Sequence, residues 1–246
     1  MTGIWPMAAI TLAVGTLACL GYLRLKARPA RRFIWLLFLG LPLSFLINRL
    51  VKGPLVNFAA GAAGIAPGLG LTTPLWFLLF TWWLSPLTEE LVKLLPLAVP
   101  QARRFLAQPG DALIAGLALG MSFGLGEAFY IAWGVAQTPA YAGLPWGMFT
   151  GFAIERLMVV FAHGWMTALA AYGLSRGGKR ALLWLLAAMG LHALINAGAI
   201  LYHLNLIAAA ASQISLFVGM VISMKVFERL HRVHRVPAES NETVYF

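Results

Sequence analysis

The stretch of residues 85–93 reads SPLTEELVK, and it decides how this chain must fold. It sets two adjacent carboxylates, Glu89 and Glu90, within an otherwise apolar run. The chain has only 8 Asp and Glu residues, and an ionised side chain at the centre of a membrane costs about 2.5–3.5 kcal/mol on insertion scales. The two carboxylates therefore need polar partners, which other apolar runs must bring to the same depth.

The composition excludes an ordinary soluble domain. Hydrophobic residues make up 61% of the 246 residues and charged residues 11%, with a mean hydropathy of +0.81. A soluble domain carries about 25% charged residues. The net charge of +10 does not indicate a nucleic-acid partner, because the basic residues fall in short clusters between apolar runs, as topology signals do. We expect an integral membrane protein whose surroundings are the lipid bilayer.

The apolar runs predict an all-α fold, a polytopic transmembrane helix bundle of about seven spans. Each run is close to the roughly 20 residues that a membrane helix needs. The stretch 53–73 is rich in Gly, Ala and Pro, which predicts an irregular or re-entrant connection covered by protein or water. The seven expected spans are residues 4–23, 33–50, 74–99, 112–134, 147–174, 181–202 and 204–227.

The positive charges give the expected orientation. Most of the 18 Lys and Arg residues cluster at the ends of the first, third, fifth and seventh spans, which predicts an extracytoplasmic N-terminus and a cytoplasmic C-terminus. We expect a multi-pass protein of the cell membrane with one transmembrane domain, residues 1–236, a polar-site core at about 74–203, and a polar, disordered tail at 237–246. The single cysteine, Cys19, excludes an intramolecular disulfide and a Cys-based metal site.

Four later residues have the depth that the Glu pair requires. At a helical rise of about 1.5 Å per residue, Glu89, Glu127, His163, His192 and Asn196 lie roughly 15–24 Å from the cytoplasmic ends of their spans. Four helices would therefore present ionisable or amide groups near the membrane midplane, which indicates a functional site. The alternative to a functional site is a structural polar cluster that holds the helices together.

Local patterns support this convergence. Gly116, Gly120 and Gly124 recur at helical spacing, which lets a neighbouring backbone approach closely. Pro86 is expected to kink its helix and open space for water beside Glu89. Lys93 follows Glu89 by four residues, a favourable spacing for an ion pair. Arg156 shares a helical face with His163, so Lys93 and Arg156 are expected to support the site.

The residue types indicate hydrolysis by an activated water. The sequence has no HExxH, no GxSxG and no paired membrane Asp, so the signatures of the common zinc, serine and aspartyl enzymes are missing. A carboxylate acting as general base on water remains. Because Glu89 and Glu90 point about 100° apart on a helix, we expect Glu89 to be the base and Glu90 its partner.

The other polar residues have expected roles in the same reaction. His163 could share or orient the water. His192 and Asn196, one turn apart, could donate hydrogen bonds to the oxyanion of a tetrahedral intermediate, a contribution of about 3–4 kcal/mol where it has been measured. Peptide hydrolysis uses such a set best, so we expect an intramembrane glutamic-type endopeptidase without cofactor or metal.

The motifs also carry a family resemblance over about residues 85–200. The motifs are Glu89-Glu90-x-x-Lys93, Phe123-x-x-x-Glu127, Arg156 with His163 seven residues on, and His192-x-x-x-Asn196. With these motifs the chain resembles PrsW-type membrane peptidases and their YhfC branch, relatives of the CAAX prenyl proteases and the wider group of glutamic intramembrane proteases.

The resemblance implies that Glu89 is the catalytic glutamate, Glu90 its neighbour, and His192 with Asn196 the oxyanion-binding pair. One departure stands out, since the prenyl proteases have His where this chain has Glu127. Water activation would then pass to His163. The implied substrate is a membrane protein or lipid-anchored peptide, and a single-span membrane protein fits better than a prenylated one.

Two other classes of function use similar residues. Midplane Glu and His residues also build the proton relays of transporters and proton-coupled channels, although the halves of this chain show no internal similarity of the kind many transporters have. A catalytically inactive membrane scaffold is the third reading. Within the enzyme reading, a metal held by Glu89, Glu127, His163 and His192 is an open alternative, because carboxylate and imidazole suit zinc.

Overall fold

The computed structural model describes residues 3–27, 29–65 and 73–234. Within these residues all regular secondary structure is helical, which confirms the predicted class. The predicted tail at 237–246 lies outside the described residues. The longer elements are α1 (Ile4–Lys26), α3 (Leu36–Ile47), α4 (Gly53–Ala62), α5 (Leu75–Val92), α7 (Pro109–Ala136), α8 (Thr150–Arg176), α9 (Gly178–His203) and α10 (Ala209–His234).

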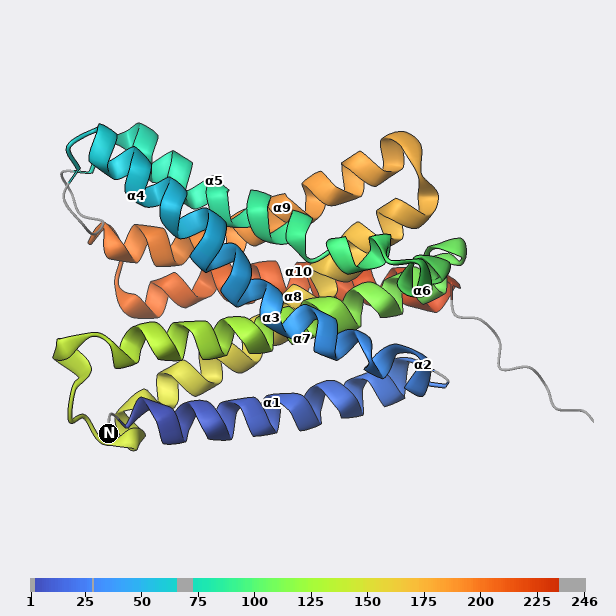
Figure 1. Cartoon of the computed structure of the whole chain (residues 1–246), viewed down its shortest axis with the longest axis horizontal. Helices are drawn as coiled ribbons and strands as arrows, with labels where there is room; N and C mark the ends of the chain where they lie inside the picture. Colours follow the sequence, from blue (N-terminus) through green and yellow to red (C-terminus); the bar gives the residue numbers. More distant parts are fainter. Residues whose placement is uncertain (1–2, 28, 66–72, 235–246) are drawn as a thin grey trace, which may run out of the picture.

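Helix α7 runs through the middle of the bundle, between α1 on one side and the α4 and α5 pair on the other (Figure 1). Its glycine stripe packs against the backbone of α8, as predicted. A methyl group on Gly116 would lie 2.5 Å from the carbonyl oxygen of Thr167, and one on Gly120 would collide with the carbonyl of His163. The same contacts hold Val160, His163 and Thr167 of α8 against α7.

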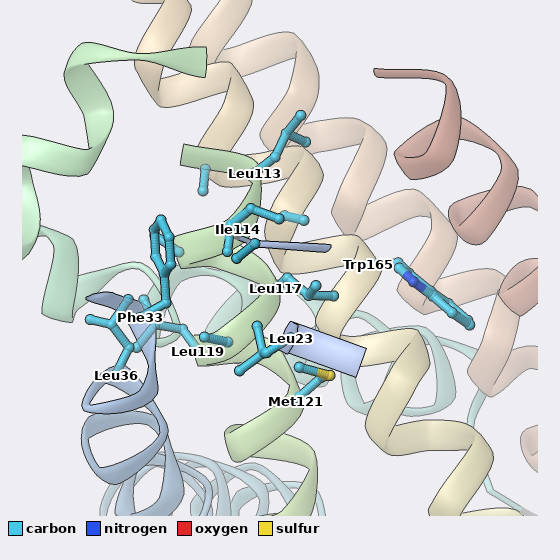
Figure 2. Packing of buried hydrophobic residues seen from close by; sticks show 14 of the residues in the cluster. Leu23, Phe33, Leu36, Leu113, Ile114, Leu117, Leu119, Met121 and Trp165 are labelled. Atoms are coloured by element: carbon cyan, nitrogen blue, oxygen red, sulfur yellow. The ribbon is translucent and has the colours of Figure 1, made fainter. Parts of the chain in front are cut away.

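Apolar side chains fill the remaining space around α7. Figure 2 shows the main cluster, in which Leu23 of α1 and Leu36 of α3 meet Leu117 and Met121 of α7. Trp165 lies on the α8 side of this cluster. On the opposite face of α7, Gly126 approaches the backbone of α3 at Leu41. Close packing on two faces fixes α3 and α8 against α7, while α9 packs on α8 and α5 packs on α9.

The second span is longer than the sequence predicts. It runs over Arg31–Ala62, through the short helix α2 (Arg31–Ile34), α3, a π-helical turn at Asn48–Lys52, and α4. In Figure 1 this span crosses the bundle diagonally. The expectation of an irregular connection from residue 53 was therefore wrong over Gly53–Ala62, because helical hydrogen bonds satisfy the backbone there. Residues 66–72 of that connection lie outside the described residues.

Helix α5 carries the Glu pair and is shorter than the predicted span 74–99. It continues as one helix through Pro86 to Val92. Three short helical segments follow it, at Leu95–Ala98, Pro100–Arg103 (α6) and Arg104–Ala107. In the described part of the chain six helices are long and apolar enough to cross a membrane, namely Ile4–Lys26, Arg31–Ala62, Pro109–Ala136, Trp146–Arg176, Gly178–His203 and Ala209–His234. Helix α5 is not one of these six.

Candidate active site

The Glu pair lies where α5 packs against α9. The indole N–H of Trp82 donates a hydrogen bond of 2.8 Å to the carbonyl oxygen of Ala193, which ties the two helices together one residue beyond His192. Both Glu89 and Glu90 are buried, with 1% and 0% of their surface exposed. Carboxylates this deeply enclosed require partners of opposite charge or hydrogen-bond donors, and the neighbouring helices supply both.

Glu89 has one of its two oxygens paired. The ammonium group of Lys52 lies 2.5 Å from its Oε1. The other oxygen, Oε2, is buried and has no hydrogen-bond partner among the described residues. Its nearest imidazole atom is Nε2 of His192, at 3.8 Å. The gap between these two atoms is too wide for a direct hydrogen bond.

Glu90 binds two donors through one oxygen. Its Oε1 lies 2.6 Å from Nζ of Lys93 and 2.8 Å from Nδ1 of His192. The expected ion pair between Lys93 and Glu89 is therefore wrong, because Lys93 pairs with Glu90, three residues before it, and not with Glu89, four residues before it. Since an ionised carboxylate only accepts hydrogen bonds, Nδ1 of His192 carries the proton, and Nε2 faces the gap toward Glu89.

A second branch of the network connects Lys93 with Glu127. Nζ of Lys93 lies 2.7 Å from Nδ1 of His163, and it stands 4.5 Å over the ring of Phe123. Nε2 of His163 lies 3.2 Å from Oε2 of Glu127, which also accepts a hydrogen bond of 3.2 Å from Arg156. With Lys93 as donor to Nδ1, the proton of His163 is on Nε2 and points at Glu127.

Arg156 closes the network toward the surface. It pairs with Glu127 and with its own neighbour Glu155. The core of the site thus holds the carboxylates of Glu89, Glu90 and Glu127 against the cations Lys52, Lys93 and Arg156. Removing one partner of such a buried pair leaves an uncompensated charge, which is strongly destabilising.

A cavity of about 310 Å³ gives access to part of this network. Its wall includes Glu127, His163, His192 and Asn196, together with Ser212 and Gln213 of α10. Asn196 makes no side-chain hydrogen bond to the described part of the chain, so its amide is available to the cavity. Glu89 and Glu90 do not line the cavity, but His192, which contacts both of them, does. The space expected beside Glu89 at Pro86 is therefore not where the cavity opens.

The structure brings together all the residues that the sequence singled out. Glu89, Glu90, Glu127, His163 and His192 form one network with Lys93 and Arg156, and Asn196 lies on the adjoining cavity wall. Sequence reasoning missed Lys52, which lies just outside the predicted second span at residues 33–50. The apolar residues on both sides of Lys52, with a Gly-Pro after it, were the signal that it belongs inside the bundle.

Helices of membrane length that enclose carboxylates, imidazoles and a cavity are expected of an intramembrane enzyme or of a proton-coupled transporter. The sequence pattern of one family, described as PrsW family intramembrane metalloprotease, matches residues 30–226. That match covers most of the chain, so the chain belongs to the PrsW family and is a membrane-embedded protease. No curated protein matches the chain, and no solved structure does.

The family's description implies a metal ion, and the donor set can be tested against it. One ligand atom each from Glu89, His163 and His192 lies within 4.8 Å of the others, and carboxylate and imidazole are zinc ligands. The contact of Glu90 with Nδ1 of His192 is the kind of outer-shell contact that orients a metal-binding imidazole. The residues fit a zinc-type ion in donor type, although both ring nitrogens of His163 already have protein partners.

Proposed function

We propose that this protease cleaves a peptide bond with a water molecule that Glu89 activates. The observation that carries the proposal is the buried Oε2 of Glu89, which has no partner among the described residues and faces Nε2 of His192 at 3.8 Å. Buried polar atoms of this kind are commonly satisfied by a bound water. A water that donates one hydrogen to each atom would present its lone pairs to a substrate carbonyl.

The reaction follows from these positions. Glu89 takes a proton as the water oxygen bonds to the carbonyl carbon, and the carbonyl oxygen gains the negative charge. The amide of Asn196 donates to this oxyanion. Nε2 of His192 can also donate to it only while the imidazole carries two protons, because Nδ1 already donates to Glu90. When the C–N bond breaks, Glu89 returns its proton to the leaving amine.

The remaining residues hold this arrangement. Glu90 orients His192, and Lys93 neutralises Glu90. His163 already donates to Glu127, so we assign it to positioning and not to water activation. Arg156 balances the charge of Glu127 on the cavity wall.

A metal ion is the alternative source of water activation at the same place. Glu89, His163 and His192 would hold it. When bound, such an ion supplies a Lewis acid that makes water nucleophilic near neutral pH. The two partners of His163 favour the metal-free reading, because an ion could bind either of its ring nitrogens only by displacing one of them.

The setting of the reaction is also part of the proposal. We infer seven spans in the cell membrane, namely the six long apolar helices and α5, which is third in chain order. The N-terminus would be extracytoplasmic and the C-terminus cytoplasmic. Residues 1–236 would form one domain with its polar core at about 74–203. The substrate is a membrane protein or a lipid-anchored peptide. The Glu pair and the His192-x-x-x-Asn196 motif support a relation to the CAAX prenyl protease group.

The test is cleavage by the purified protein, reconstituted in lipid vesicles, of a panel of single-span membrane proteins. We expect discrete fragments whose new termini mass spectrometry assigns to one peptide bond, with the same rate when a chelator is added. Loss of cleavage with the chelator and recovery with zinc would move the activation of water to the metal. A proton flux across the vesicles without any cleavage would favour the proton-coupled channel, and neither activity would favour the scaffold.

A further inference from the structure

Lys52 reaches the Glu pair from an irregular turn of its helix. The turn Asn48–Lys52 is π-helical, and the N–H of Gly53 donates to the carbonyl of Asn48, five residues back. The next residue is Pro54, which has no N–H and whose ring clashes with the carbonyl four residues before it in an α-helix. A wider turn relieves that clash. The Gly53-Pro54 sequence is thus the local reason for the π-helical turn.

The wider turn changes the direction in which Lys52 points. A π-turn holds about one residue more than an α-turn, so the residues on its two sides are rotated relative to one another by up to about 100°. In this structure Lys52 faces α5, and its Nζ lies 2.5 Å from Oε1 of Glu89. Its side chain is only 16% exposed, so the cation is largely removed from solvent.

The contact divides the two oxygens of Glu89 between two tasks. Lys52 is the hydrogen-bond donor to Oε1, while Oε2 keeps no partner among the described residues. Lys93, the residue that follows α5, pairs with Oε1 of Glu90. We propose that Lys52 is a positioning residue, which the π-turn presents to Glu89 so that Oε1 is fixed and Oε2 faces the water site beside His192. The role in cleavage rests on the proposed function.

The pairing itself is tested without any substrate. Lys52→Met leaves Glu89 buried without its cation, so we expect the melting temperature of the purified protein to fall by about 5 °C or more. In a Glu89→Gln background the same substitution should cost much less, because no charge is left unpaired. Lys179→Met, an exposed lysine at the start of α9, is the matched control and should change neither background. Equal losses in both backgrounds would overturn the pairing.

The positioning role is tested on a substrate that the wild type cleaves. We expect Lys52→Met to lower kcat about a hundredfold and to leave KM within about twofold, and Lys52→Arg to recover at least about a tenth of the wild-type kcat. A change in KM alone, or full activity of Lys52→Met, would overturn the role. If the wild type cleaves no substrate, the proposed function fails, and the melting experiment still decides whether Lys52 pairs with Glu89.

Discussion

At the residue scale, two adjacent glutamates of one helix have different surroundings. Glu90 accepts hydrogen bonds through Oε1 from Lys93, the residue after α5, and from His192 of α9, and its Oε2 has no partner among the described residues. Glu89 meets a single cation from a distant span, and its own unpartnered Oε2 lies 3.8 Å from Nε2 of His192. This difference follows from the turn of about 100° between neighbouring helical residues. It is the physical reason for assigning the base to Glu89 and the orienting role to Glu90.

Asn196 provides a test of the oxyanion site. Leu is similar in size but cannot donate a hydrogen bond, so Asn196→Leu should lower kcat at least about a hundredfold, as the loss of one oxyanion donor does elsewhere. The melting temperature should stay close to that of the wild type, because the amide has no partner in the described part of the chain. Retained activity would return Asn196 to a packing role on the cavity wall.

The sequence predicted most of this site from the cost of burying charge. Glu89, Glu90, Glu127, His163 and His192 stood out because each lies within an apolar run at a similar depth. The partner of Lys93 could not be predicted, since residues three and four apart share one helical face and side-chain reach decides between them. Lys52 was missed because a lysine near a span end also reads as a topology signal.

At the element scale, the contact between α7 and α8 sets the distance between Glu127 and His163. We expect Gly120→Ala to destabilise the protein by about 1–3 kcal/mol, because its methyl group would collide with the carbonyl of His163. The control is Gly134→Ala on the same helix, where nothing lies within 4 Å of the added carbon. It should be neutral or slightly stabilising. Equal melting temperatures of the two variants would contradict close packing at the stripe.

The helical elements were predictable where the apolar runs are long, and the second span shows where such prediction stops. Gly, Ala and Pro in 53–62 favour irregular backbone in water, but a membrane leaves unpaired backbone groups unsatisfied. The chain therefore stays helical through Pro54, with a π-helical turn at Asn48–Lys52 directly before Gly53 and Pro54. Composition alone could not predict that turn, nor that it presents Lys52 to another helix.

At the scale of the whole molecule, the distribution of positive charges predicts how the chain is oriented in the membrane. We expect residues 104 and 140, at the two ends of α7, to lie on the cytoplasmic and extracytoplasmic sides. Arg104 and Ala140 are both exposed, so cysteines placed there in a Cys19→Ala background should react with a membrane-impermeant thiol reagent from opposite sides of intact cells. Labelling of both from the same side would contradict the orientation.

The measurement that tests the central claim most directly compares Glu89→Gln with Glu90→Gln on one verified substrate. Glutamine keeps the shape of the side chain and loses the basic carboxylate. We predict that Glu89→Gln abolishes cleavage while its melting temperature shows that it is folded, and that Glu90→Gln keeps measurable activity or loses stability through its unpaired Lys93. Loss in Glu90→Gln alone would reverse the two roles. Cleavage by Glu89→Gln at the wild-type rate would contradict the mechanism.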